Sequence, residues 1–281
     1  MTGIINWNEL RKAIISEGRK RRGHEKPGEM WDKRAEEFNR STKERSERTE
    51  RQVASLGLDP NSTVLDVGAG TGRLSVPMAK IAKQVTAVDQ SAGMLSYLQD
   101  NMAQEGLSNY RVIQKRWEDV RLGVDIEPHD VVVASHSLGM FDLQEALAKM
   151  DEAAKRRVVI FTAAGKWFFD DFEEELWERI YDRPPRRHGG FRSDYMLLYN
   201  ILHDMGIFAN VEIKDAEHVQ RYESLDEAVE RWKARREIPA ENESILREYL
   251  AKNLEDDNGG SLVFRRRTKS AMIWWDKSES S

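Results

Sequence analysis

Residues 64–72 read Val-Leu-Asp-Val-Gly-Ala-Gly-Thr-Gly, a short, mostly apolar run followed by three alternating glycines. The apolar residues around Asp66 are typical of a short buried strand, and the periodic residues of 72–83 predict a helix directly after the glycines. Glycine at 68, 70 and 72 allows a sharp turn and lets a ligand lie against the main chain where a Cβ would collide. We interpret the turn as a cofactor seat. A tight strand-to-helix turn without a ligand is the alternative.

Short runs rich in valine and isoleucine alternate with helical stretches outward from this turn. Further strands are predicted at 84–89, 110–114, 130–135 and 157–163, and further helices at 91–105 and 142–154. Such alternation indicates right-handed βαβ units and a parallel sheet buried on both faces. The sequence therefore predicts a doubly wound, Rossmann-like α/β domain with helices on both faces of a mostly parallel sheet.

Both ends of the chain extend beyond this core. In the N-terminal arm, Trp7, Leu10, Ile14 and Ile15 recur at helical spacing, and the glycine-containing stretch 18–28 suits a hinge, so we expect a lid over the acceptor. After Gly165 an amphipathic helix predicts a cap insert, followed by further helices and closing strands of the same sheet. The predicted parts are a helical arm at 1–55, the core at 56–165 and the remainder at 166–281.

Composition excludes several classes of protein. The chain of 281 residues has a net charge of −5, no cysteine and six scattered histidines, which excludes disulfides and thiolate metal sites and leads us to expect no bound metal. No apolar run reaches the ~20 residues of a membrane-spanning helix, so we expect a cytoplasmic protein without membrane contact. The locally basic arm carries interleaved acids, which favour a solvated helical face over a nucleic-acid surface.

Two acidic residues indicate the type of ligand. Asp89 ends the strand that follows the glycine turn, where a carboxylate can accept both hydroxyl protons of a ribose. Asp66 precedes the first glycine by two residues and would repel a pyrophosphate, but it suits a cofactor with an ammonium and a sulfonium. The D-x-G-x-G-x-G spacing also differs from the G-x-G-x-x-G of dinucleotide binders. A nicotinamide dehydrogenase is therefore disfavoured.

At this point the sequence resembles the class I S-adenosylmethionine-dependent methyltransferases. The segment VLDVGAGTGRLS is similar to their first motif, AVDQSAGML to the second, and DVVVASHSLGMF and RVVIFTAAG to their fourth and fifth strands. The resemblance covers residues 64–165 and implies a seven-stranded sheet, S-adenosylmethionine as cofactor and S-adenosylhomocysteine as product. It also implies that Asp66 binds the amino group of the cofactor and that Asp89 binds the ribose. In the same reading Gln90 and Met94 border the adenosine, and the methionine end lies on Gly68, Ala69, Gly70, Thr71 and Gly72.

The adenine side departs from the family pattern. Many relatives carry an acidic residue followed by a small one after the third strand, whereas this chain has Arg116 and Trp117. Trp117 either flanks the adenine, with Glu118 or Asp119 supplying an acceptor, or is an aromatic residue of the core or its rim. Trp31, in a segment similar to the cofactor-covering helix of the family, either stacks over the pocket or anchors its helix.

The loop after the fourth predicted strand is the expected meeting place of methyl donor and acceptor. Ser135 begins it and is expected to contact the cofactor, and His136 is the candidate general base because imidazole titrates near neutral pH. His136 can equally shape the loop, since methyl transfer from a sulfonium often needs only alignment and desolvation.

The predicted function is methyl transfer from S-adenosylmethionine to an acceptor held under a cap. An Asn-Pro-Pro-Tyr-like motif for amino groups is missing after the fourth strand, so a small-molecule acceptor is favoured, with protein or RNA left open. The alternative is a non-catalytic module that binds S-adenosylmethionine or S-adenosylhomocysteine and holds a partner. The basic residues at 186–188 either grip an anionic acceptor or form a solvated connector.

Overall fold

The central sheet begins at the strand that precedes the glycine turn. Strand β1 (Thr63–Val67) pairs in parallel with β2 (Gln84–Asp89) and with β4 (His129–Ser135). In the same way β2 pairs with β3 (Tyr110–Gln114), and β4 pairs with β5 (Ala154–Ala164). The computed structural model describes residues 5–22, 27–43, 46–164, 170–181, 195–236, 238–257 and 259–277.

The strand order confirms the predicted topology. Neighbouring strands follow the order β3-β2-β1-β4-β5-β8-β6, in which β6 spans Asn210–Tyr222 and β8 spans Leu262–Asp276. A short strand, β7 (Leu254–Asp256), pairs antiparallel with β8 and is the eighth member of the sheet. The order reverses between β1 and β4, and in open α/β sheets ligands bind at the carboxyl ends of the strands beside such a point.

The helices follow the predicted alternation with small shifts of boundary. The helix expected at 72–83 is shorter, because residues 71–74 form turns. The core and arm contain α1 (Trp7–Arg22), α2 (Pro27–Lys43), α3 (Ser46–Ala54), α4 (Ser75–Ala79), α5 (Ala92–Gln104), α6 (Leu143–Ala153) and α8 (Tyr195–Asp204). The remaining helices are α7 (Asp170–Tyr181), α9 (Leu225–Arg236) and α10 (Glu243–Asn253), with 3-10 turns at Trp117–Asp119 and Ala240–Asn242.

Alternating residues of β1 serve the two faces of the sheet. Leu65 and Val67 belong to an apolar cluster with residues of α6 and α8, whereas Val64 belongs to a second cluster with residues of α3, α4 and α5. Because successive side chains of a strand point to opposite faces, this division places helices on both sides. The three-layer architecture predicted from the sequence is confirmed.

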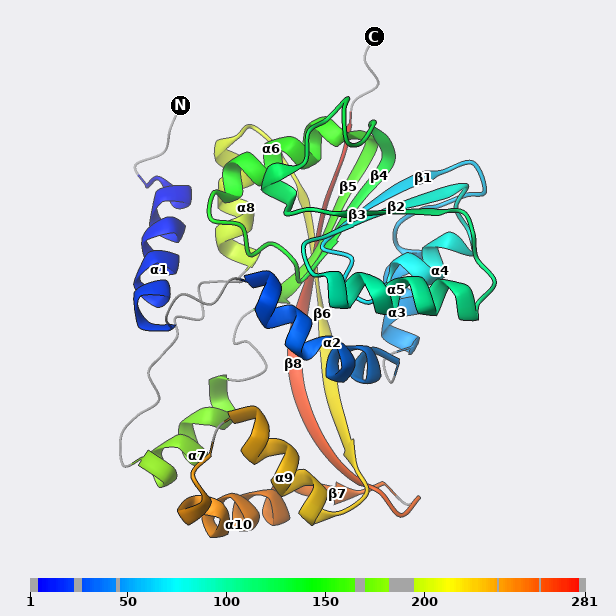
Figure 1. Cartoon of the computed structure of the whole chain (residues 1–281). Helices are drawn as coiled ribbons and strands as arrows, with labels where there is room; N and C mark the ends of the chain where they lie inside the picture. Colours follow the sequence, from blue (N-terminus) through cyan, green and yellow to red (C-terminus); the bar gives the residue numbers. More distant parts are fainter. Residues whose placement is uncertain are drawn as a thin grey trace. The chain divides into compact units, whose positions relative to one another are not determined.

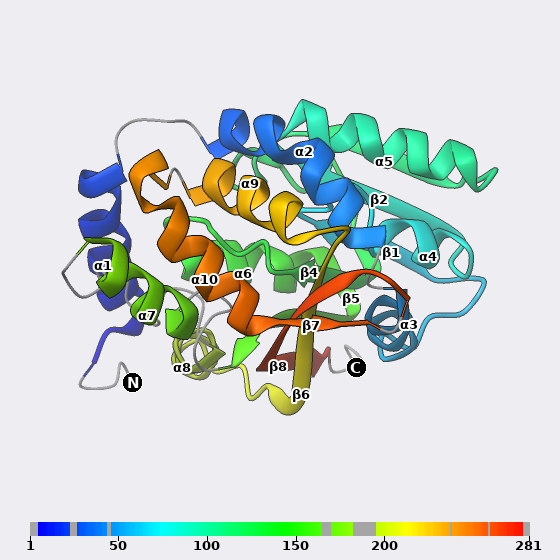
Figure 2. The same ribbon diagram turned by 90° about the horizontal axis from the view of Figure 1, so that it is seen from below.

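The chain divides into two compact units. The first contains residues 1–162, 191–212 and 271–281, and the second contains 163–190 and 213–270. In the first unit α2 lies along α5, and α1 lies beside α8 (Figures 1 and 2). The second unit has its own apolar cluster, built around Trp232, Tyr249 and Phe264. The basic residues at 186–188 lie outside the described residues.

One residue of the predicted apolar stripe on α1 packs against the core. Trp7 packs against the cluster that α6 and α8 share with the sheet. Leu10 is 41% exposed and faces away. Residues 23–26 of the predicted hinge lie outside the described residues, and α1 continues to Arg22. The apolar side of α1 is therefore narrower than the spacing of the four residues suggested.

Candidate active site

The glycine turn is fixed between two neighbouring strand ends. The main-chain N–H groups of Gly68 and Ala69 both donate to the carbonyl oxygen of Val88, at 2.8 and 3.1 Å. Gly68 has a φ of +76°, and a Cβ at that position would lie 2.2 Å from Cβ of Ser137. Only glycine combines this φ with so close an approach to the loop after β4. The turn thereby brings the first motif and that loop together.

Asp89 completes the turn from the end of β2. The N–H of Gly70 donates to Oδ2 of Asp89 at 2.9 Å, and the N–H of Ser91 donates to Oδ1 at 2.9 Å. Burial raises the pKa of Asp89, while the bonds from Ser91 and Gly70 oppose that rise. Each carboxylate oxygen has about two acceptor positions. The main chain of Gln90 also bonds to this carboxylate, so the ribose hydroxyls predicted from the sequence would share it with three main-chain donors.

Asp66 is a buried acid with one hydrogen-bond donor. Its residue is 2% exposed, and its Oδ2 accepts a 2.6 Å hydrogen bond from Oγ of Ser75. Burial raises the pKa of Asp66 to about 6, against the opposing effects of Ser75 and the Arg73 charge. A cation beside the carboxylate would restore its ionised form. The residue therefore suits the positively charged cofactor predicted for it.

Helix α2 is hydrogen-bonded to the N-terminus of α5, which lies within the second motif. Oδ1 of Asp32 accepts hydrogen bonds from Oγ of Ser91, at 2.6 Å, and from the N–H of Gly93, at 2.9 Å. These bonds lower the pKa of Asp32. They also place an acidic acceptor at the N-terminus of α5, next to its cap residue Ser91. Asp32 carried no signal in the sequence reading, because its partner lies far away in the chain.

Two aromatic residues of α2 lie on the same side of that helix. The rings of Trp31 and Phe38 meet edge to face with centroids 5.9 Å apart. A Cβ on Gly70 would lie 3.6 Å from Cε1 of Phe38, so Phe38 stands at the glycine turn. The sequence analysis proposed Trp31 for the pocket and did not single out Phe38. The i, i+7 spacing of the two residues was the available signal.

On the predicted adenine side, the side chains of Trp117 and Met94 lie in the core. Trp117 is 3% exposed, and its Nε1 donates to the carbonyl oxygen of Ala146 in α6 at 3.1 Å. The indole ring thus follows the core alternative, and a contact with adenine stays a prediction only for the main chain here. Met94 is also buried, whereas Arg116 is exposed and pairs with Glu118 at 2.7 Å.

His136 has an unusual main-chain conformation at the predicted meeting place of donor and acceptor. Its φ is +55°, a region that residues other than glycine rarely adopt, and its N–H donates to the carbonyl oxygen of Phe161 at 2.9 Å. Nε2 of His136 lies 3.0 Å from Nη2 of Arg48 on α3. Since a guanidinium can only donate, Nε2 acts as the acceptor and the ring proton is assigned to Nδ1. In this arrangement Nε2 is not available as a general base.

Arg73 connects α3 to the end of β4. Its guanidinium donates to Oγ1 of Thr49 and Oε1 of Gln52, at 3.0 and 2.7 Å, and to Oγ of Ser135 at 2.8 Å. Ser135 is therefore a partner of Arg73, and its predicted contact with the cofactor stays a prediction. Arg73 follows the last glycine of the motif directly, and that position was the only sequence signal for its role.

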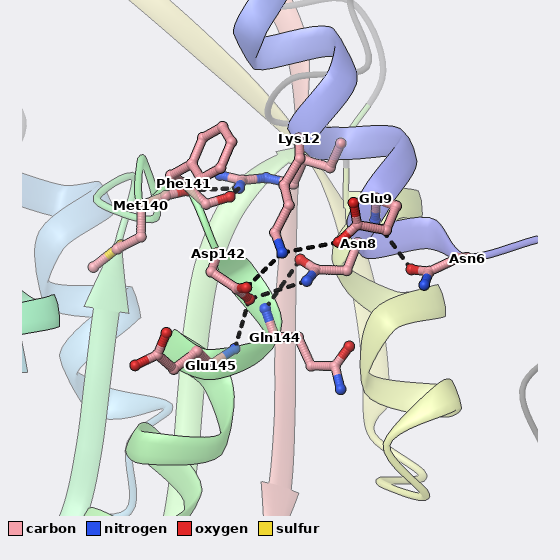
Figure 3. Close-up of polar contacts among 10 residues, drawn as sticks. Asn6, Asn8, Glu9, Lys12, Met140, Phe141, Asp142, Gln144 and Glu145 are labelled. Carbon is pink, nitrogen blue, oxygen red and sulfur yellow. Dashed lines mark hydrogen bonds and ion pairs between the residues drawn. The ribbon is translucent and has the colours of Figure 1, made fainter.

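Helix α1 holds the rest of the loop after β4. Arg11 is 2% exposed and donates to the carbonyl oxygens of Leu138, Met140 and Phe141, at 2.8, 2.6 and 3.2 Å. Figure 3 shows the neighbouring polar contacts, in which Asp142 accepts from Asn8 at 3.0 Å and from Lys12 at 2.6 Å. The loop that carries His136 is thus fixed by α1 on one side and contacted by α3 on the other.

The described part of the chain contains neither a candidate membrane span nor a candidate metal site. None of its helices is long and apolar enough to cross a membrane. Within the same residues, no group of three or more acidic or histidine side chains could hold a metal ion.

Comparison with known proteins agrees with this geometry. A family model described as a methyltransferase domain matches residues 64–157. An uncharacterized protein of Haemophilus influenzae is 27% identical over 255 residues, which cover 89% of this chain and 90% of that protein. The solved structure of the YcgJ protein of Bacillus subtilis has 16% identity and a TM-score of 0.54, covering 83% of this chain and 98% of that one.

A shorter match covers 28% of the chain. A probable ribosomal RNA small subunit methyltransferase A of Methanosphaera stadtmanae is 36% identical over 78 residues, which are 28% of this chain and 27% of that protein. The fold, the site and the family model define an S-adenosylmethionine-dependent methyltransferase. Residues 64–157 match the methyltransferase domain, the core has a Rossmann-like fold, and S-adenosylmethionine is the cofactor that this domain indicates.

Proposed function

We propose that this methyltransferase acts on a small molecule, which it binds at the carboxyl ends of β1 and β4. The observation that carries the proposal is the contact of Arg48 with His136, which brings a helix of the chain itself against the acceptor loop. Arg73 attaches the same helix to Ser135. A site covered in this way suits a compact acceptor better than a folded RNA or protein surface.

The residues at the carboxyl ends of β1 and β2 have distinct roles in the proposed reaction. Gly68–Gly72 hold the methionine end of the cofactor, Asp66 binds its amino group and Asp89 binds the ribose. S-adenosylmethionine supplies an electrophilic methyl group on a cationic sulfur. The protein aligns the acceptor with that methyl group and excludes water, so that the acceptor's lone pair forms the new bond while the sulfur takes the electrons of the broken one.

His136 has a positioning role in this proposal. Its Nε2 already accepts from Arg48, and its main chain is attached to β5 through Phe161. These two contacts give the imidazole a defined place in the loop, which supports the alternative that His136 shapes the site. A proton that the acceptor loses can pass to solvent as the product leaves.

The size class of the acceptor can be tested with unfractionated cell extract. The protein is incubated with the extract and S-adenosylmethionine labelled in the methyl group, and the products are separated through a small-pore filter. The expected result is label in a filtrate compound other than S-adenosylmethionine that appears only when the protein is added, and label retained with RNA or protein would contradict the small-molecule proposal. Stabilisation of the protein by S-adenosylhomocysteine but not by NAD checks the cofactor site independently.

A further inference from the structure

Two arginines of α3, Arg48 and Arg51, have partners of different kinds. Arg51, one turn beyond Arg48, forms an ordinary ion pair with Glu47 at 3.0 Å. Arg48 instead contacts the imidazole of His136, and within the described residues it has no carboxylate partner. Arg48 is partly buried, and its pKa is lowered by that burial and by the charge of Arg51. A guanidinium in this setting gains energy from an added anion.

The surrounding charges favour an anion as well. Arg73 donates to three neutral oxygens beside the same strand end, and its charge also acts on Asp66. The sulfonium of the cofactor adds a further positive charge at the methyl group. An anionic acceptor would add a favourable charge interaction with Arg48 and the sulfonium, which an uncharged or cationic acceptor would not.

On these grounds we propose that Arg48 and His136 together bind an oxyanion, either a carboxylate or a phosphate, that belongs to the methyl acceptor. This inference rests on the proposed function and adds the chemical class of the substrate. Arg48 offers donors in a planar fork, and the imidazole contributes a second donor when Arg48 turns from Nε2 to the anion and Nε2 takes up a proton from solvent. The binding arrangement therefore replaces one contact that the two residues now make with each other.

The oxyanion is the anchor of the substrate, and another atom receives the methyl group. Hydrogen bonds from a guanidinium withdraw charge from an oxyanion and make it a poorer nucleophile. The methylated atom is a neutral nitrogen, oxygen or sulfur nucleophile of the same molecule, placed in line with the methyl group. Its lone pair forms the new bond, the sulfur keeps the electrons of the broken bond as neutral S-adenosylhomocysteine, and a proton on the methylated atom passes to solvent.

Fragments of the proposed acceptor allow a test before the acceptor itself is known. The full-length protein, saturated with S-adenosylhomocysteine, is titrated with benzoate and separately with methyl phosphate. The response of the His136 ring is followed by NMR, assigned with His136→Gln. We expect an upward shift of the His136 pKa with at least one probe. Arg48→Gln should weaken that probe's binding by at least about tenfold, and Arg48→Lys should weaken it less.

Arg51→Gln is the matched control, because it removes an arginine of the same helix that the structure pairs with Glu47. It should leave the response of His136 unchanged. The probe that binds identifies the oxyanion as a carboxylate or a phosphate. Absence of a response to both probes in the unmodified protein would overturn the proposal, as would an equal response in Arg48→Gln.

Cofactor binding separates this inference from the proposed function. The affinity for S-adenosylhomocysteine, measured by calorimetry, should be the same within about threefold in Arg48→Gln and in the unmodified protein. A tenfold loss would assign Arg48 to the carboxylate of the cofactor and overturn the inference while leaving the proposed function intact. Failure of the unmodified protein to bind S-adenosylhomocysteine would instead contradict the proposed function itself.

Discussion

The N–H of Gly70 donates to Oδ2 of Asp89 at 2.9 Å, which links the first two motifs of the site through one hydrogen bond. The acid that is expected to bind the ribose therefore also holds the turn that is expected to bind the methionine end. Removing its carboxylate affects both parts of the cofactor site. A substitution at Asp89 must be compared with one that keeps its shape.

Asp89→Ala should weaken the binding of S-adenosylhomocysteine by about 1.5 to 3 kcal/mol, because two hydroxyls and the N–H of Gly70 lose a charged acceptor. Asp89→Asn keeps one acceptor oxygen and should lose less. Calorimetry on the folded variants measures both. Asp100→Ala, an exposed acid on α5, is the control. An unchanged affinity in Asp89→Ala would remove Asp89 from the site.

Gly70→Val should abolish the binding of S-adenosylhomocysteine, because the side chain would fill the turn beside Phe38. Its φ of +57° also makes the substitution costly to stability, by about 1 to 2 kcal/mol. Gly106→Val is matched for strain, since Gly106 has a φ of +68° and nothing lies within 4 Å of its added Cβ. The midpoint temperature of thermal unfolding should fall by a similar amount in the two variants. Retained binding in Gly70→Val would place the cofactor elsewhere.

Asp66 should make stability depend on pH. Because burial raises its pKa from 3.8 to about 6, the folded protein binds more protons than the unfolded chain between these values. The free energy of unfolding should therefore fall by about 3 kcal/mol as the pH rises through this window. Denaturant unfolding at several pH values measures the effect, and Asp66→Asn should remove it. An equal pH dependence in Asp66→Asn would assign the effect to other groups.

The same residue should link cofactor binding to proton release. A cationic amino group near Asp66 lowers its pKa towards the ordinary value, so binding of S-adenosylhomocysteine should expel a proton in the window below pH of about 6. Calorimetry in two buffers with different enthalpies of ionisation detects that proton. Asp66→Asn should abolish the release, and Asp100→Asn should preserve it. Binding without proton release in the unmodified protein would exclude contact between Asp66 and the amino group.

Local patterns predicted most of the core and only part of the site. The strand before Gly68 and the acid at the end of the next strand lie within one βαβ unit, so their meeting follows from the topology. The contacts of Arg11 with Met140 and of Arg48 with His136 join segments far apart in the chain. Charged helical residues of this kind look like solvated positions in a sequence, and only the tertiary structure shows their partners. Trp117 was ambiguous for the opposite reason, because a large aromatic residue suits both a core and a pocket.

Arg11 gives the last prediction, because its buried guanidinium serves three carbonyl oxygens of the acceptor loop. Arg11→Gln should destabilise the protein by about 1 to 3 kcal/mol, since it leaves buried acceptors without a donor. Amide hydrogen exchange should increase in residues 136–142. The affinity for S-adenosylhomocysteine should stay within about tenfold of that of the unmodified protein. Methyl transfer from labelled S-adenosylmethionine to the extract should fall much further, because the loop no longer holds the acceptor in line.

Lys12→Gln is the control for this prediction. Lys12 lies next to Arg11 and pairs with Asp142 at 2.6 Å, and a partly exposed pair of this kind contributes about 0 to 1 kcal/mol. The control should therefore change exchange in 136–142 and methyl transfer much less than Arg11→Gln does. If Arg11→Gln loosens the loop but leaves turnover intact, α1 stabilises the fold without positioning the acceptor. If it lowers cofactor affinity and turnover equally, the loop after β4 serves the cofactor, and the separation between the two sides of the site is wrong.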